Sequence, residues 1–324
     1  MKALVYTGVE TMEFRDAPEP TARAGEHLIR VDSSGICGSD MHAYLGHDAR
    51  RPAPLILGHE AAGVIVGGPR DGDRVTINPL VTCGTCPACR AHRENICPNR
   101  EIISMPPREG AFAQFVTMPE RNLVDVPNGV ALEKAALAEP LAVSWHAVKL
   151  GLDALHPAQE REALVLGGGA IGLAAALALN AMGVDRIQIV EPNELRRQFL
   201  RSRAHVDAIA EGKGQYPLVI DAVGFAATRA AASALVSPGG VIAHIGLGED
   251  LGGLDVRRMT LQEITFIGTY TYTNADFSDA AAAIFDGRLG PLDWIETRPL
   301  SDGAQAFAAL RAGQVQTPKI VLKP

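Results

Sequence analysis

The sequence predicts an α/β protein with two domains, one rich in β-strands and one in which strands and helices alternate. The chain has 324 residues, of which 47% are hydrophobic, enough to fill two cores. Apolar and polar residues alternate in the first part, whereas short apolar runs and Ala-rich helical stretches follow each other in the second. A glycine-rich turn at 167–172 lies between an expected strand and an expected helix.

The N-terminal part is expected to form a mostly β domain on a barrel-like core. Its expected strands cover 2–6, 26–32, 61–66, 74–77 and 111–116, each with Gly or Pro nearby. A cysteine-rich lobe at about 80–100 interrupts them, and the Ala-rich stretch 132–150 is compatible with helix.

The second part predicts a parallel sheet with helices on both faces, because strands and helices follow each other in turn. Strands are expected at 163–166, 186–190, 218–222, 241–245 and 263–268, and helices at 171–182, 194–204 and 226–235. Towards the C-terminus the pattern indicates helices at 279–285 and 303–311 and a strand at 319–323.

Composition and charge exclude several classes of function. Thirty Lys and Arg stand against 37 Asp and Glu, a net charge of -7 without runs of like charge, so neither nucleic acid nor an anionic membrane is an expected partner. The N-terminus lacks the apolar core of a signal peptide, and a cytoplasmic location is expected. The uncharged stretch 163–183 contains five glycines, which divide it into strand, turn and helix and argue against a membrane span.

Four of the five cysteines have the spacing of a metal site. They are Cys83, Cys86, Cys89 and Cys97, in the pattern C-x2-C-x2-C-x7-C. In a reducing compartment disulfides are not expected, and this spacing brings four thiolates around one tetrahedral ion. Zinc is favoured over an iron–sulfur cluster, which would need an electron partner. Four thiolates leave no open position, so this zinc is expected to be structural.

The fifth cysteine, Cys37, belongs to a second cluster between residues 35 and 60. The polar residues of this stretch include Ser39, Asp40, His42, His59 and Glu60. Thiol, imidazole and carboxylate groups between Gly and Pro residues suit a zinc site held on loops. Taken alone, a cysteine is more commonly a small buried hydrophobe, so the cluster needs support from the rest of the chain.

Residues 167–172, Gly-Gly-Gly-Ala-Ile-Gly, match the dinucleotide-binding pattern G-x-G-x-x-G between a strand and a helix. Gly167 permits a tight turn, Gly169 lets the backbone approach a pyrophosphate, and Gly172 lets helix and strand pack closely. Glu191 can bind the ribose hydroxyls and favours NAD, although the nearby Arg196 leaves NADP open. The residues expected at the cofactor are Gly167, Gly169, Ala170, Ile171, Gly172, Glu191 and Arg196.

Together these motifs resemble the zinc-dependent medium-chain dehydrogenase/reductase family, that of the alcohol dehydrogenases. The matching motifs are Gly35-x-Cys37-Gly-Ser-Asp40-x-His42, Gly58-His59-Glu60, Gly72-Asp-Arg-Val75, the four-cysteine lobe and the glycine-rich turn. The resemblance implies a GroES-like barrel catalytic domain at 1–142 and 273–324, with the structural-zinc lobe at about 80–100, and a Rossmann NAD-binding domain at 143–272. The stretch 139–146 resembles the branch of sorbitol, other polyol and butanediol dehydrogenases.

The resemblance also implies site residues, namely Cys37, Ser39, His42, His59, Glu60 and Glu139. Cys37, His59 and Glu139 would surround a catalytic zinc, with Glu60 competing with Glu139 for direct ligation. Either carboxylate could instead orient water or balance charge. Asp40 would bond the free N–H of His59 and fix its tautomer.

The implied chemistry is the reversible NAD-linked oxidation of a secondary alcohol to a ketone. Zinc would lower the pKa of the substrate hydroxyl, and the alcohol carbon would pass hydride to NAD. Ser39 and His42 stand where the family relays a proton towards solvent, although Ser39 is also a favoured cap residue. Tyr44 would line the substrate pocket or belong to the core. The substrate class is a polyol, sugar alcohol or vicinal diol, and the family forms homodimers or homotetramers.

The sequence departs from the family at two places, which limits what the resemblance implies about the nucleotide domain and the substrate. The segment 200–218 is short, so part of the nucleotide domain is expected to be trimmed, and Thr271 stands where sorbitol dehydrogenases carry an arginine, which argues against sorbitol. The alternatives are a dehydrogenase of simple alcohols or of an acid such as threonine, possibly with NADP. A zinc-bearing sensor without turnover should have lost ligands or relay residues, but these are intact here. A zinc-free quinone reductase should lack Cys37 and the cysteine lobe, but both are present.

Overall fold

The computed structural model describes residues 1–324, which divide into two compact units. The first comprises Met1–Glu139, Phe277–Asp286 and Ile295–Pro324, and the second comprises Pro140–Asp276 and Gly287–Trp294. Two of the four divisions fall inside helices, namely α4 (Ala138–Ala154) and α9 (Asn274–Phe285). The sequence pattern gave no sign that residues 287–294 belong with the second unit.

The first unit is rich in short strands, as the alternating pattern predicts. Its strands are β1 (Lys2–Gly8), β2 (Thr11–Asp16), β3 (Glu26–Gly35), β4 (Leu55–Ile56), β5 (Glu60–Val66), β6 (Arg74–Ile77), β7 (Leu80–Val81), β8 (Glu101–Ile102), β9 (Phe115–Pro119), β10 (Leu123–Asp125), β17 (Ile295–Pro299) and β18 (Lys319–Lys323). Its helices are α1 (Gly38–Tyr44), α2 (Pro87–Arg90), α3 (Leu132–Ala135) and α10 (Gly303–Arg311), with three 3-10 helices at Glu94–Ile96, Glu120–Asn122 and Leu300–Asp302. The strand expected at 111–116 begins only at Phe115, and β2, β17 and α1 were not foreseen.

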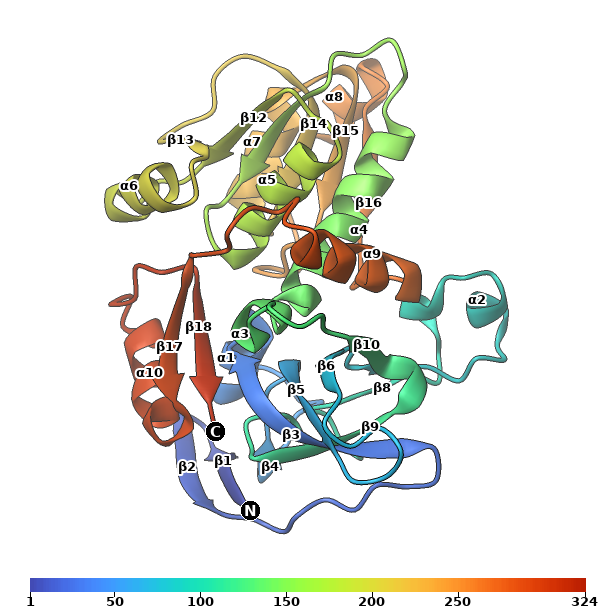
Figure 1. Ribbon diagram of the computed structural model, residues 1–324. Coiled ribbons are helices and arrows are strands. Elements are labelled where there is room, and N and C mark those ends of the chain that lie inside the picture. The colour runs from blue at the N-terminus through green and yellow to red at the C-terminus, as the bar shows by residue number, and fades with distance from the viewer. The chain divides into compact units, whose positions relative to one another are not determined.

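The last strand of the chain lies beside one of the first. The largest sheet of this unit has the order β10-β6-β5-β3-β18-β17, with β9 also paired to β3, and a smaller sheet has the order β2-β1-β4. β18 runs antiparallel to β3, with Val321 opposite Gly35, so the C-terminal segment completes the N-terminal unit (Figure 1). Both ends of the chain also share one core, in which the rings of Phe112 and Phe307 lie 6.0 Å apart.

The second unit is a six-stranded parallel sheet with helices between the strands. Its elements are β11 (Glu162–Leu166), α5 (Ala170–Ala181), β12 (Arg186–Val190), α6 (Glu194–Arg203), β13 (Asp207–Ile209), β14 (Tyr216–Asp221), α7 (Ala226–Leu235), β15 (Val236–His244), α8 (Val256–Leu261) and β16 (Thr265–Gly268). The strand order is β13-β12-β11-β14-β15-β16. This is the doubly wound arrangement whose direction of winding reverses between β11 and β14, the place where such sheets bind nucleotides.

The connection between β13 and β14 lies within the segment 200–218, which the sequence predicts to be trimmed. It covers only residues 210–215 and contains no helix, although a parallel sheet usually places a helix in such a crossover. Gly212 lies against the sheet instead, where an added Cβ would approach Leu235 to 2.8 Å and Leu164 to 3.1 Å. The loop therefore packs directly on a sheet face.

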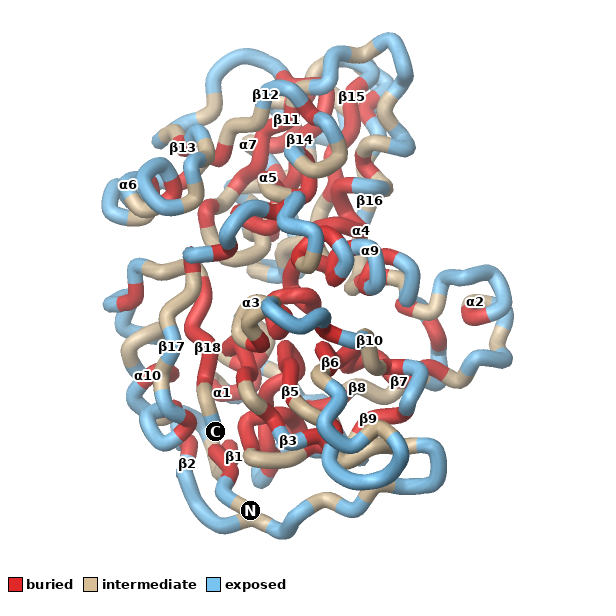
Figure 2. Tube along the Cα trace, in the orientation of Figure 1, coloured by how far each residue is buried: buried red, intermediate tan, exposed pale blue.

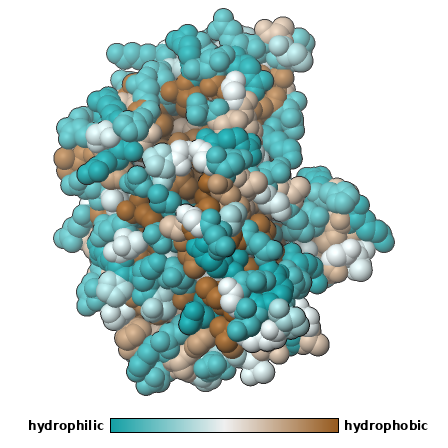
Figure 3. Space-filling view, viewed as in Figure 1, coloured by the Kyte–Doolittle hydropathy of each residue, from teal (hydrophilic) through white to brown (hydrophobic).

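Burial follows the sheets in both units. The central strands are buried and most connecting loops are exposed, including much of the lobe that carries α2 (Figure 2). Hydrophilic residues surround smaller apolar areas on the face shown in Figure 3. None of the helices combines the length and the apolarity that crossing a bilayer requires.

Candidate active site

Cys37 lies at the start of helix α1, directly after strand β3 ends at Gly35. It is the N-cap residue, and its backbone N–H donates to Asp40 Oδ2 at 3.0 Å, which closes the first helical turn. Ser39 and His42 therefore lie on a helix. The expectation that loops hold the polar groups of this stretch is wrong for Ser39 and His42. The hydrogen bond from Cys37 to Asp40 stabilises a helix start here, although the composition is typical of a loop.

His59 and Glu60 follow a turn that only glycine readily forms. Gly58 has φ +92°, and its N–H donates to Asp40 Oδ1 at 3.2 Å, which ties this turn to α1. One candidate ligand atom from each of Cys37, His59 and Glu60 lies within 4.8 Å of the other two. The structure thus brings together three of the residues expected at the catalytic zinc.

The imidazole of His59 is buried among three polar side chains. Nδ1 lies 3.4 Å from Asp40 Oδ1 and 3.3 Å from Ser104 Oγ, and Nε2 lies 3.4 Å from Ser39 Oγ. Burial acts to lower the pKa of His59, but the charge of Asp40 outweighs it and raises that pKa well above its usual value. An N–H at Nδ1 facing Asp40 leaves Nε2 available to a metal. Asp40 thus lies where the sequence predicts the partner that fixes the tautomer of His59.

Glu60 is fully buried, and one of its carboxylate oxygens has no protein partner. Oε1 accepts a hydrogen bond from Lys319 Nζ at 2.6 Å, whereas Oε2 is buried without a hydrogen bond. Lys319 also donates to the carbonyl of Ile36 at 3.0 Å. Burial acts to lower the pKa of Lys319, but the negative charges of Glu60 and Cys37 outweigh it and raise that pKa. Lys319 therefore stays charged in the interior.

The ion pair between Glu60 and Lys319 reaches across the strand that lies between them. In the sheet, β3 lies between β5, which begins with Glu60, and β18, which begins with Lys319. Gly35 of β3 is opposite Glu60 in the register, and a Cβ there would lie 2.1 Å from Glu60 Oε2. Glycine is needed at this position because the carboxylate passes over its Cα.

The cluster fits a zinc ion of the catalytic type. Thiolate, imidazole and carboxylate are the donors that zinc takes, and three protein donors leave a fourth position open. The unpartnered oxygen of Glu60 supports this fit, because a buried carboxylate oxygen needs a proton, a donor or a cation.

Glu139, His42 and Tyr44 are not part of this trio. Glu139 is buried in the first turn of α4, and its charge contributes to the raised pKa of Lys319. His42 is exposed on the second turn of α1. Tyr44 is buried, with its ring 5.2 Å from that of Phe307, and so belongs to the core.

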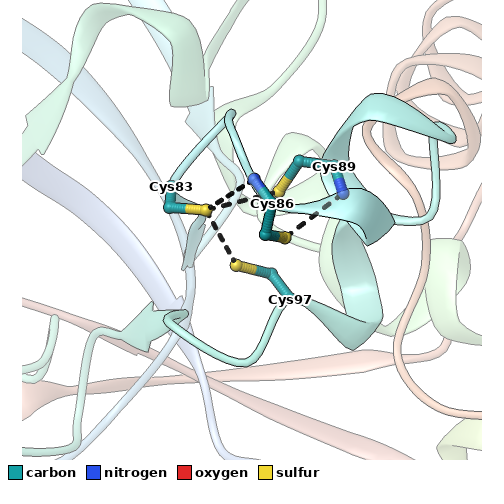
Figure 4. A group of neighbouring side chains, drawn as sticks. All are labelled: Cys83, Cys86, Cys89 and Cys97. Atoms are coloured by element: carbon teal, nitrogen blue, oxygen red, sulfur yellow. Dashed lines mark hydrogen bonds between the residues drawn. The ribbon is translucent and has the colours of Figure 1, made fainter.

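The four remaining cysteines form a separate cluster in the lobe that carries α2 (Figure 4). Cys83 Sγ lies 3.6 Å from Cys97 Sγ and 3.9 Å from Cys89 Sγ. Sulfurs held tetrahedrally at zinc's usual distance are about 3.8 Å apart, so the cluster fits zinc. Backbone N–H groups lower the pKa of Cys83 to about 5, whereas burial raises the pKa of Cys89 to about 12. An ion bound here must displace protons from some of these thiols.

The glycine-rich turn joins β11 to α5. Gly167 has φ +98°, and a Cβ on Gly172 would lie 1.8 Å from the carbonyl oxygen of Gly167, so the helix packs directly on the turn. Gly169, the N-cap of α5, has open space where its Cβ would be, and Ala170 and Ile171 begin the helix. Such a turn leaves helix N–H groups free for a pyrophosphate.

Glu191 directly follows β12 and is buried beside this turn. Its Oε2 accepts a hydrogen bond from the N–H of Gly168 at 3.0 Å, and its Oε1 accepts one from the N–H of Asn193 at 2.8 Å. Arg196 Nη1 lies 3.5 Å from Oε2. The carboxylate is thus held in place, with the arginine turned towards it.

Comparisons with known proteins agree with this geometry. Residues 23–128 match the family model described as alcohol dehydrogenase GroES-like domain, and residues 170–286 match that described as zinc-binding dehydrogenase. The chain is 33% identical to a sorbitol dehydrogenase of Bacillus subtilis over 85% of its own length and 83% of that protein. The chain belongs to the zinc-binding alcohol dehydrogenase family.

Further relatives of this dehydrogenase cover almost its whole length. A 2-dehydro-3-deoxy-L-galactonate 5-dehydrogenase of Pseudoalteromonas atlantica is 30% identical over 95% of this chain and 94% of that protein. A crystal structure described as a short chain alcohol dehydrogenase from E. coli CFT073 with NADH superposes on this chain with a TM-score of 0.90. The two chains are 25% identical, and the superposition covers 100% of this chain and 99% of the other. The predicted fold class, enzyme class and zinc and nicotinamide cofactors are confirmed.

Three residues of this dehydrogenase were missed by sequence reasoning: Ser104, Lys319 and Arg51. Ser104 contacts His59 and has φ +69°, a conformation that costs a residue with a side chain about 1–2 kcal/mol. Lys319 is one of the two lysines at the ends of strand β18, and no pattern distinguishes it from Lys323. Arg51 lies in a polar stretch with a second arginine, and no spacing distinguishes it.

Replacing Cys97 with Ser is expected to remove the structural zinc alone, because a hydroxyl is a poor substitute for a thiolate. Metal analysis should fall from about two zincs per chain to about one, and the melting temperature should fall because a structural zinc contributes to folding. The matched variant Cys37→Ser should also lose about one zinc but melt closer to the wild type. Unchanged zinc content in Cys97→Ser would contradict the four-cysteine site.

Replacing Gly35 with Ala is expected to destabilise the first unit by about 1–3 kcal/mol, as overpacking does. The new Cβ would displace the Glu60 carboxylate, which can move only by leaving Lys319. Urea unfolding followed by circular dichroism measures the loss. Gly38→Ala is the control, because nothing lies within 4 Å of its added Cβ. Equal stability of the two variants would show that the carboxylate does not depend on Gly35.

Proposed function

We propose that this dehydrogenase oxidises a secondary alcohol of a polyol or vicinal diol to a ketone, with NAD as the hydride acceptor. The observation that carries the proposal is the trio of Cys37, His59 and Glu60, in which one buried carboxylate oxygen of Glu60 has no protein partner. The relatives support the substrate class, since one is named sorbitol dehydrogenase and another, 28% identical, is named probable D-xylulose reductase A.

In this proposal Cys37, His59 and either Glu60 or Glu139 hold the catalytic zinc. A zinc ion in such a site polarises the hydroxyl of an alcohol, and NAD accepts the hydride. Asp40 holds the proton of His59 at Nδ1, so that Nε2 stays a donor towards the metal. Cys83, Cys86, Cys89 and Cys97 hold the structural zinc.

The hydroxyl proton of the substrate needs a path to solvent, and Ser39 and His42 are proposed to provide it. Ser39 lies beside the buried ring of His59, with its Oγ 3.4 Å from Nε2. His42 follows three residues later on α1, on the same face of the helix, and is exposed. A serine hydroxyl beside His59 and an exposed imidazole are suited to successive proton transfers.

The proposed cofactor site comprises Gly167, Gly169, Ala170, Ile171, Gly172, Glu191 and Arg196. A pyrophosphate would lie over Gly169 at the start of α5, and the Glu191 carboxylate would accept hydrogen bonds from the adenosine ribose. The Glu191 carboxylate supports NAD rather than NADP, because it would repel the 2′-phosphate of NADP. Arg196 faces this carboxylate.

We also propose that the enzyme is a cytoplasmic homodimer or homotetramer. Five cysteines without a disulfide suit a reducing compartment. β16 is an edge strand, and the segments before it expose large apolar side chains that a second copy could cover. These are Leu247, Leu251, Val256 and Leu261.

A panel of alcohols tests the substrate class. We expect NADH formation with 2,3-butanediol and xylitol and less with sorbitol, because Thr271, at the position that carries arginine in sorbitol dehydrogenases, offers no positive charge. Cys37→Ser should abolish turnover and still bind NAD. Turnover of ethanol alone, or of threonine alone, would replace the polyol assignment by one of those activities. A fully active Cys37→Ser enzyme would refute the zinc site itself.

Replacing Glu191 with Ala tests the cofactor assignment. The variant loses the hydrogen bonds from the ribose to the charged Glu191 carboxylate. Its kcat/KM for NAD should therefore fall by about 10- to 100-fold, and its preference for NAD over NADP should become smaller. Glu194→Ala is the matched control, because Glu194 lies nearby on α6 and 55% of its side chain is exposed. If both variants keep the preference of the wild type, Glu191 does not contact the ribose.

A further inference from the structure

Arg51 is buried near the proposed catalytic zinc site, although no motif of the sequence singles it out. Its side chain is 3% exposed and makes three hydrogen bonds. Nε donates to the carbonyl of Ser104 at 3.0 Å, and Nη1 donates to the carbonyl of Ser39 at 3.2 Å and to Asp48 Oδ2 at 2.9 Å. One guanidinium group thus joins two distant segments of the backbone.

The two serines that Arg51 holds are the two that flank the ring of His59. Ser104 Oγ lies 3.3 Å from Nδ1, and Ser39 Oγ lies 3.4 Å from Nε2. The ring is therefore bounded at both nitrogens by hydroxyls whose own backbones are bonded to Arg51. A shift of the guanidinium would move both hydroxyls relative to the ring.

We propose that Arg51 is a positioning residue, which fixes the orientation of the His59 imidazole towards the catalytic zinc by holding Ser39 and Ser104 on either side of it. The inference rests on the proposed function, because it takes His59 as a zinc ligand. Arg51 itself contacts neither the metal ligands nor, in this proposal, the substrate.

The backbone of Ser104 shows why such support is needed. This residue has φ +69°, a conformation that residues with a side chain rarely adopt unless their surroundings enforce it. It is fully buried, so water cannot supply a partner for its carbonyl. The Arg51 bond satisfies that carbonyl and holds the turn that presents the Ser104 hydroxyl to His59.

The planar guanidinium is suited to this task and an ammonium is not. Arginine directs Nε and Nη1 along fixed directions to two separate carbonyls, whereas lysine offers one compact charge. Asp48 balances the charge of Arg51 and is held in turn by Arg50. Replacement by lysine therefore keeps the charge pair with Asp48 and loses at least one of the two carbonyl bonds.

The experiment compares Arg51→Lys with Arg50→Lys in the zinc-loaded enzyme. Arg50 is the neighbouring arginine and also bonds Asp48, but 61% of its side chain is exposed. Zinc release is followed with a chromophoric chelator, and the release phase that Cys37→Ser lacks is assigned to the catalytic site. Steady-state kinetics and the visible spectrum of the cobalt-substituted enzyme, which reports ligand geometry, are measured on the same variants.

For Arg51→Lys we expect loss of the catalytic zinc to be about 10- to 100-fold faster, the range typical of lost partners around a metal site. The release phase of the four-cysteine site should not change, kcat should fall more than KM rises, and the cobalt band should shift. Arg50→Lys should match the wild type in all four readouts. The proposal would be overturned if Arg51→Lys released the catalytic zinc at a rate within about twofold of the wild type and showed the wild-type cobalt spectrum.

Ser104→Ala keeps the test decisive if Arg51→Lys does not fold. It removes only the hydroxyl at Nδ1 and leaves the carbonyl bond to Arg51, so it should accelerate catalytic zinc release in the same direction. Wild-type release and spectrum in Ser104→Ala would overturn the proposal, whatever Arg51→Lys does. If instead Cys37→Ser keeps both zincs and full activity, the proposed zinc site fails first.

Discussion

The buried ion pair between Glu60 and Lys319 is the interaction on which the candidate active site depends. The two residues are 259 positions apart, and both are nearly inaccessible to water. Removing one member of such a pair typically costs about 3–5 kcal/mol, because the other charge is left without compensation. The pair therefore requires β18 to return to the N-terminal unit and lie beside β3, where Ile36 donates its backbone N–H to the carbonyl of Ile320 at 2.9 Å. The cluster of Cys37, His59 and Glu60 is thus completed by the last strand of the chain.

The negative groups around this pair favour a cation at the cluster. Glu60, Cys37 and Glu139 are the charges that raise the pKa of Lys319, and one carboxylate oxygen of Glu60 is buried without a partner. Burial acts to raise the pKa of Asp40, but the charge of the facing His59 outweighs it and lowers that pKa. A cation would supply the partner that the buried Glu60 oxygen lacks. The four-cysteine lobe keeps two excess negative charges with zinc, and it can do so because much of it is exposed.

How far the sequence predicted these sites depended on how local their geometry is. The four-cysteine site lies within one short stretch, and its spacing alone indicated the ligands. The residue types of Cys37, His59 and Glu60 only suggested a metal site, and the resemblance to the dehydrogenase family implied their role as ligands. The turn at Gly167 was found from its place between a strand and a helix. Lys319 and Ser104 were not found, because their contacts depend on strands and turns that meet only in the folded chain. The alternation of strands and helices predicted the parallel sheet, but could not show the helix-free loop from β13 to β14 or the return of residues 287–294.

The position of Gly35 shows how closely metal chemistry and strand order are linked in this protein. Neighbouring strands are about 4.8 Å apart, so a carboxylate on β5 that reaches a lysine on β18 must cross the whole width of β3. That crossing is possible only where β3 has no side chain, and Gly35 is also two residues before Cys37. The residue that opens the path for Glu60 therefore stands next to the turn that places the thiol. A strand order other than β5-β3-β18 would separate the carboxylate from its counter-ion, and Glu60 would then lie beside Cys37 and His59 without the charge of Lys319.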